Sequence, residues 1–148
     1  MIEIFTDGGC RPNPGVGAWA AILLWKGHMR ELTGSERGTT NNRMEMMAVI
    51  KGLGAIKKPN QKITVYTDSK YVQQGITSWI KKWKKNGWKT TQNTPVKNED
   101  LWKKMDRLLG EHDVTFRWIK GHNDNPLNER ADALCTQSIN REYGGVYV

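Results

Sequence analysis

Hydrophobic and polar positions in the first quarter of the chain follow the two-residue period of β-strands. The first such run ends on Asp7, the second is almost wholly apolar and the third is more polar; they span residues 2–7, 17–25 and 28–38. A turn rich in Pro, Asn and Gly at residues 10–15 and the pair Lys26-Gly27 separate them. Short links between successive strands indicate an antiparallel meander.

The chain then changes to a helical period. An apolar stripe and preceding N-cap candidates at residues 39–42 predict a helix over residues 43–56; the stripe consists of Met44, Met47, Ala48, Leu53 and Ile56. Further helices are predicted over residues 69–77, 98–109 and 127–140, and further strands over residues 63–67 and 114–119. The tail from residue 141 is left unassigned.

The order of these elements predicts one α/β domain over residues 1–148, with a mixed five-stranded sheet flanked by helices. The strand at residues 63–67 follows a helix, so it can return parallel to the first strand and beside it. The two strands lead into Thr-Asp pairs that contain Asp7 and Asp68. These carboxylates would emerge together at the carboxyl ends of neighbouring strands, where open α/β sheets bind ligands.

Composition narrows the class of protein. The chain has 148 residues, of which 37% are hydrophobic, and no apolar run approaches the length of a membrane span, so we expect a globular domain without a membrane partner. Two cysteines, Cys10 and Cys135, are too few for a disulfide framework, and no basic-then-apolar secretion segment begins the chain. We therefore expect reduced thiols and a cytoplasmic location. We also expect a monomer.

Charge is distributed unevenly. The formal net charge is +8, and residues 69–98 contain seven lysines but no Asp or Glu. In residues 79–89 the lysines alternate with Trp79, Trp83 and Trp88. A local basic stretch with aromatic residues favours a nucleic-acid partner. The alternative is a solvated basic face over tryptophans that belong to the core, and both can be partly true.

Four carboxylates stand where the predicted sheet can bring them together. Asp7 and Asp68 end strands, Glu45 lies in the first turn predicted for a helix, and Asp132 lies on the last helix. Oxygen ligands of this kind suit Mg²⁺, and a pair of such ions can assist phosphodiester hydrolysis. The pattern has simpler explanations as well: Asp7-Gly8 is typical of a hairpin turn, and a Glu at a helix start complements the helix dipole.

The sequence resembles the bacterial type 1 ribonucleases H. The similarity runs in the family's order along nearly the whole chain, through residues 5–10, 13–15, 39–45, 67–69, 83–88, 95–98, 120–122 and 128–132. The resemblance implies an endonuclease that cuts the RNA strand of an RNA–DNA hybrid with Mg²⁺ or Mn²⁺. It also implies that the metal-binding and catalytic carboxylates are Asp7, Glu45, Asp68 and Asp132, assisted by His122 in a loop that must move.

The resemblance assigns nucleic-acid contacts too. Cys10, Asn13, Asn41 and Asn42 match positions that contact the minor groove of the hybrid, where short polar groups can bond RNA 2′-hydroxyls. The stretch around Trp79, Trp83, Lys84, Lys85 and Trp88 matches a basic protrusion that grips the DNA strand. Two positions depart from the family pattern: Lys70 stands where an amide is common, which suggests a phosphate contact, and Asn86 stands where some relatives have a basic residue.

Three other functions fit parts of the sequence. A hybrid or duplex binder without activity would explain the lysines but not the carboxylates, which repel phosphate unless metal is bound. A transposase or integrase nuclease would share the carboxylates but usually brings further DNA-binding domains. A metal-dependent phosphatase fits poorly, because Gly8 and Gly9 follow Asp7 with no second acid nearby.

Overall fold

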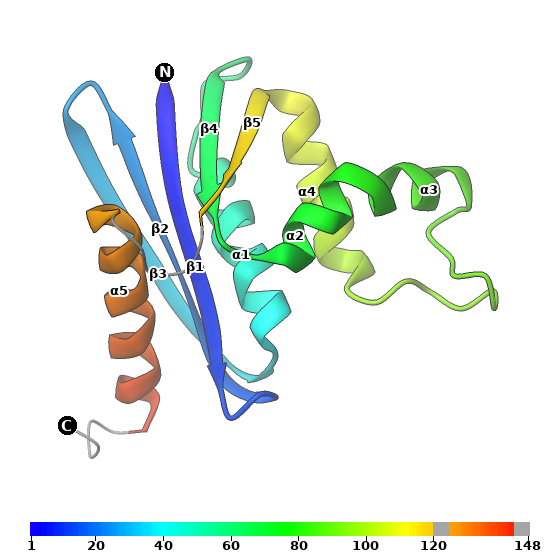
Figure 1. Ribbon diagram of the computed structural model, residues 1–148, viewed down its shortest axis with the longest axis horizontal. Coiled ribbons are helices and arrows are strands. Elements are labelled where there is room, and N and C mark those ends of the chain that lie inside the picture. Colours follow the sequence, from blue (N-terminus) through cyan, green and yellow to red (C-terminus); the bar gives the residue numbers. More distant parts are fainter. Residues whose placement is uncertain (120–124, 144–148) are drawn as a thin grey trace.

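The computed structural model describes residues 1–119 and 125–143. Within them the chain forms five strands and a series of helices around one sheet (Figure 1). The strands are β1 Ile2–Arg11, β2 Gly15–Trp25, β3 His28–Thr39, β4 Lys62–Thr67 and β5 Asp113–Trp118. The helices are α1 Asn41–Gly54, α2 Lys70–Gln74, a π-helical segment Gly75–Trp79, α3 Ile80–Lys85, α4 Glu99–Glu111 and α5 Pro126–Glu142.

The sheet is mixed, as predicted. Its strand order is β3-β2-β1-β4-β5; β1, β2 and β3 pair antiparallel, whereas β4 pairs parallel with both β1 and β5. The α/β prediction of a five-stranded sheet flanked by helices is therefore confirmed. The parallel neighbours β1 and β4 bring together the two strand ends that carry acidic residues.

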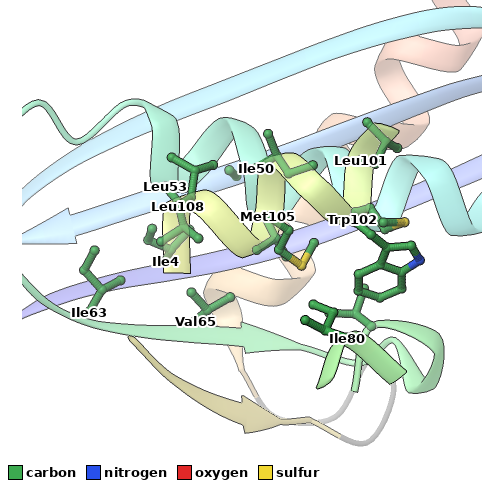
Figure 2. Packing of buried hydrophobic residues seen from close by; sticks show 14 residues of the cluster. Ile4, Ile50, Leu53, Ile63, Val65, Ile80, Leu101, Trp102, Met105 and Leu108 are labelled. Atoms are coloured by element: carbon green, nitrogen blue, oxygen red, sulfur yellow. The ribbon is translucent and has the colours of Figure 1, made fainter. Parts of the chain in front are cut away.

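Helices cover both faces of the sheet. Figure 1 shows α5 on one face and α1 and α4 on the other, with α2 and α3 extending away from the sheet. The larger buried cluster lies between the sheet, α1 and α4, where Ile4, Val65 and Met105 meet (Figure 2). A smaller cluster joins Phe5 to Leu134 and Cys135 beneath α5. Helix α1 is buried on more than one side because it is packed between the sheet and α4.

Strand β1 differs from its predicted length. It does not end at Asp7 but continues to Arg11 through the glycines that were compatible with a turn. A Cβ at Gly8 would overlap the backbone of Met44 and Glu45. Gly8 is thus required by the close approach of α1 to β1 rather than by a change of chain direction.

The helical segment after β4 also differs. The predicted helix over residues 69–77 extends instead through α2, the π-helical segment and α3 to Lys85, so most of the lysine–tryptophan stretch is helical. Within it, a Cβ at Gly75 would overlap the ring of Trp102. In the described part of the chain, no helix is long and apolar enough to cross a membrane.

Candidate active site

Three carboxylates converge at the end of the β1–β4 strand pair. Register pairs Phe5 with Tyr66, so Asp7 and Asp68 each follow two residues later on parallel neighbours. Glu45 reaches the same point from α1, because Gly8 allows that helix to lie against β1. One oxygen from each of these three carboxylates lies within 4.8 Å of the others. The predicted convergence is therefore present in the fold.

Glu45 does not lie in the first turn of its helix, as the sequence had suggested. Helix α1 begins at Asn41, after the N-cap Thr40, whose hydroxyl accepts a hydrogen bond from the Arg43 backbone N–H at 3.2 Å. Glu45 is consequently in the second turn, and the first turn holds no acidic residue. Its position reflects proximity to Asp7 and Asp68 more than the helix dipole.

Asp132 approaches from the other side. It lies on α5, which packs on β1 through Ala131 and Cys135, and it lines the same cleft as the other three carboxylates. The Cys135 thiol donates a hydrogen bond to the Asp7 backbone oxygen at 3.4 Å, which ties α5 to the strand beside the carboxylates. Asp132 is not among the three carboxylates within 4.8 Å, so it forms the outer side of the group.

The carboxylates perturb one another. Burial and, next, the charges of Asp68 and Asp132 raise the pKa of Asp7 to about 8. Burial, followed by the charges of Asp7 and Asp68, raises the pKa of Glu45 well above its usual range. Without a cation the cluster therefore retains protons near neutral pH. An all-oxygen donor set with strong mutual repulsion fits a hard divalent cation such as Mg²⁺ or Mn²⁺.

The carboxylates lie in a cleft of about 560 Å³ that also gathers most of the predicted minor-groove residues. Residues from β1, α1, the β4–α2 junction and α5 line it: Asp7, Gly8, Gly9, Cys10, Arg11, Asn41, Asn42, Glu45, Asp68, Ser69, Lys70, Tyr71, Asp132, Cys135, Thr136 and Ile139. Asn13 adjoins them, since its Oδ1 accepts a hydrogen bond from the Asn41 backbone N–H at 3.2 Å. Cys10 is only 8% exposed, and its thiol donates to the backbone oxygens of Pro12 and Thr39.

The predicted protrusion residues lie outside the cleft. Trp79, Trp83 and Trp88 are half-buried. The ring centroid of Trp83 lies 5.7 Å from that of Trp79 and 6.3 Å from that of Trp88. The fully buried Trp102 anchors them from α4, 5.8 Å from Trp83. The tryptophans form a packed support, while Lys84 and Lys85 are exposed, as the mixed interpretation of this stretch anticipated. We call residues 79–89 the protrusion.

A polar network that the sequence did not indicate connects α1 and α4 with Tyr71, whose ring contacts Trp79 of the protrusion. Arg43 forms an ion pair with Asp100 at 2.9 Å and donates to Asn98 Oδ1 at 3.1 Å. Asn98 Nδ2 donates to the Tyr71 hydroxyl at 3.0 Å, and Trp102 Nε1 donates to the same oxygen at 3.2 Å. Because Tyr71 lines the cleft, this network links the helix of Glu45 to the segment that follows Asp68.

The predicted loop residue His122 lies outside the described residues.

Comparison with known proteins identifies the relatives. A family model described as RNase H matches residues 1–140. The chain is 53% identical over 143 residues to a ribonuclease H of Hydrogenovibrio crunogenus, covering 97% of this chain and 98% of that protein. It is 54% identical to a ribonuclease H of Chromobacterium violaceum over 139 residues, covering 93% of this chain and 94% of that protein.

Solved structures agree on the fold. LC9-RNase H1, described as a type 1 RNase H with the type 2 active-site motif, superposes with a TM-score of 0.82 at 27% identity, covering 95% of this chain and 72% of that one. LC11-RNase H1, solved in complex with an RNA/DNA hybrid, superposes with a TM-score of 0.74 at 22% identity and covers 97% of this chain and 99% of that one.

Proposed function

The chain belongs to the ribonuclease H family, and we propose that it hydrolyses the RNA strand of RNA–DNA hybrids in the cleft where Asp7, Glu45, Asp68 and Asp132 meet. The observation that carries this proposal is the group of three carboxylate oxygens within 4.8 Å at the end of parallel strands. Such a group repels phosphate unless a cation neutralises it, so the cleft is suited to metal-assisted phosphodiester cleavage and unsuited to simple binding.

The carboxylates have distinct roles in this proposal. Asp7, Glu45 and Asp68 would hold one Mg²⁺ or Mn²⁺ ion, and Asp7 with Asp132 would help to hold a second. When bound, the cations supply a water nucleophile at neutral pH and stabilise the leaving oxygen, giving 5′-phosphate and 3′-hydroxyl ends. Asp7 is shared by both sets, which agrees with its position between Asp68 and Asp132 and with its pKa of about 8.

Substrate recognition falls to the rest of the cleft. Asn41 and Asn42 are exposed at the start of α1, and Asn13 is held beside them, so short polar groups face the cleft where RNA 2′-hydroxyls can be bonded. Cys10 supports this edge by bonding two backbone carbonyls of neighbouring segments. Lys70 lines the cleft two residues after Asp68 and is exposed, which suits a contact with a phosphate.

The protrusion would hold the DNA strand. Its lysines are exposed around a tryptophan support, and Lys84 forms only a long ion pair, 3.5 Å, with Asp106. Trp79, Trp83 and Trp88 supply the apolar faces against which a sugar or base can rest. His122 is proposed to assist proton transfer or product release.

We further propose that residues 1–148 act as one catalytic domain and as a monomer, because one chain supplies all four carboxylates. Both cysteines are free thiols, which suits a cytoplasmic location.

The activity is tested on a labelled RNA strand paired with DNA, in the presence of Mg²⁺, Mn²⁺ or chelator. Metal-dependent cutting of the RNA in the hybrid, with single-stranded RNA, duplex RNA and duplex DNA left intact, supports the proposal. Tight hybrid binding without cutting would instead favour the binding-module function and exclude catalysis at this cleft.

A further inference from the structure

Arg11 is a cleft residue that the roles described above do not use. It ends β1, four residues beyond Asp7, so the two side chains project from the same face of the strand. That face is the one covered by α5, since Phe5 packs against Leu134 and Cys135. By the rise of a strand, Arg11 stands roughly 13 Å from Asp7 along β1.

The cleft extends past the carboxylates to Arg11. Its far end is lined by Arg11, Thr136 and Ile139. A second hollow of about 310 Å³ adjoins it, because Arg11 and Ile139 line both, together with Asn140 and Tyr143. A continuous trough therefore runs from the carboxylates along the junction of β1 and α5.

The backbone of Arg11 is held in place while its side chain is exposed. The Tyr143 hydroxyl donates a hydrogen bond to the Arg11 backbone oxygen at 2.7 Å, which anchors the end of β1 to the end of α5. Within residues 1–119 and 125–143, no carboxylate forms an ion pair with the Arg11 guanidinium. An uncompensated guanidinium on an anchored backbone is suited to bidentate binding of a phosphate.

The cleft holds one cation on each side of the carboxylates. Arg11 and Lys70 are the cations among its lining residues. Lys70 lies on the β4 side, just after Asp68, whereas Arg11 lies on the α5 side of Asp7. A strand whose reacting phosphate lies at the carboxylates would place one neighbouring phosphate toward each cation.

We propose that Arg11 binds a phosphate of the RNA strand on the α5 side of the cleavage site, and that the trough beside Ile139 carries that strand out of the cleft. This inference rests on the proposed function, because it takes the RNA strand to pass over the carboxylates. It assigns the contact to the RNA strand and not to the DNA strand, since Arg11 shares the cleft with the reacting phosphate and the protrusion lies on the other side.

The first test measures hybrid binding by fluorescence anisotropy over a series of salt concentrations, in an Asp68→Asn background that keeps the RNA intact. Arg11→Gln should weaken binding about tenfold and reduce the slope of log K against log[salt] by about 0.9. Arg11→Lys should keep the slope while losing part of the affinity. Arg30→Gln, at an exposed arginine of β3 away from the cleft, should change neither.

A second test identifies the phosphate. In the same Asp68→Asn background, neutral methylphosphonates replace the phosphates one at a time along each strand of the hybrid, and binding is measured for each. The parent should lose affinity at several RNA positions, and Arg11→Gln should become insensitive at one of them, on one side of the cleavage site. Unchanged sensitivity at every RNA position, or a loss of sensitivity on the DNA strand, would overturn the inference.

The proposed function is checked separately, by measuring whether the protein without any substitution cuts the RNA of the hybrid. If the parent does not cut, the proposed function fails and the inference fails with it. If the parent cuts but Arg11→Gln binds like Arg30→Gln and keeps the parent's sensitivity to every methylphosphonate, only the Arg11 contact is wrong.

Discussion

The cleft gathers negative charges that are partly buried, whereas the protrusion carries positive charges that are exposed. In the cleft, Asp7 and Glu45 are half-buried beside Asp68, and their pKa values are raised by burial and by one another. In the protrusion, the lysines are exposed on a support of packed tryptophans, and Lys84 forms a long ion pair with Asp106. Buried like charges are costly until a cation neutralises them, whereas exposed ones cost little and act almost independently. The difference agrees with the roles proposed for the two regions, which are metal-assisted cleavage in the cleft and binding of the DNA strand by the protrusion.

The largest effect is expected when a negative charge is removed from the cleft. Asp7→Asn should lower kcat for hybrid cleavage by about 10³-fold, because Asp7 belongs to both proposed metal-binding sets. Hybrid affinity should hold or rise, since one negative charge facing the phosphates is gone. Single-turnover cleavage and anisotropy measure the two effects separately. Asp113→Asn, at an exposed residue that begins β5, is the matched control and should leave both unchanged.

Removing charge from the protrusion should act on affinity and salt dependence. Replacing Lys81, Lys82, Lys84 and Lys85 by Gln should flatten the log–log salt slope by about 0.9 for each phosphate that these side chains neutralise in the parent. The rate of cleavage at saturating hybrid should change much less. A control set at four other exposed lysines, Lys51, Lys57, Lys58 and Lys62, keeps the net charge equal. Equal slopes in the two sets would mean that the protrusion is only a solvated face.

The cost of the buried carboxylates predicts how the metal-free protein responds to pH. Asp7 has a pKa near 8 in the folded state and an ordinary value of 3.8. Between these values the folded state binds more protons than the unfolded state, so the free energy of unfolding should fall as pH rises from about 4 to 8. Thermal melting in chelator measures this fall, and saturating Mg²⁺ should oppose it near neutral pH.

The same reasoning gives Asp7→Asn a stabilising effect. Without metal at pH 8, the variant should melt roughly 5 °C above the parent, because the repulsion with Asp68 and Asp132 is removed. The advantage should shrink when Mg²⁺ is added, since only the parent binds it fully. An unchanged or lower melting temperature in chelator would argue against mutual repulsion in the cluster.

The smallest expected effect concerns the junction between the two regions. Tyr71→Phe leaves the donors on Asn98 and Trp102 without their shared acceptor, which should cost about 1–3 kcal/mol of unfolding free energy. Tyr66→Phe, which loses one hydrogen bond to Glu3, is the control and should cost less. Chemical denaturation of both variants measures the difference. Equal losses of unfolding free energy would mean that the network at Tyr71 stabilises the fold no more than a single hydrogen bond does.

The sequence could predict the parts of this site that depend on local pattern and strand order. A helix between two strands favours a parallel return, which is why the pattern alone could place Asp7 and Asp68 side by side. The extension of β1 to Arg11 could not be predicted, because Gly8 and Gly9 are equally compatible with a turn. The actual requirement for Gly8, the approach of α1, is a tertiary contact, whereas a Cβ at Gly9 would meet open space.

Side-chain contacts between residues far apart in the sequence could not be predicted either. Arg43 and Asn98 are 55 residues apart, and Asn98 and Tyr71 are 27 apart, with no periodicity to connect them. The predicted helix over residues 69–77 ended within the π-helical segment that continues into α3. The close packing of Gly75 on Trp102, which belongs to α4, is a contact that no local pattern indicates. The location of His122 stays a prediction.

The most direct measurement of the central claim is cleavage of a labelled RNA strand in an RNA–DNA hybrid by the parent and by Asp68→Asn, side by side, with Mg²⁺ or chelator. The account predicts cutting of the hybrid's RNA by the parent with Mg²⁺ alone, and its loss in Asp68→Asn while the hybrid still binds. Cutting in chelator, or equal cutting by Asp68→Asn, would contradict a metal-assisted reaction at the carboxylate cleft.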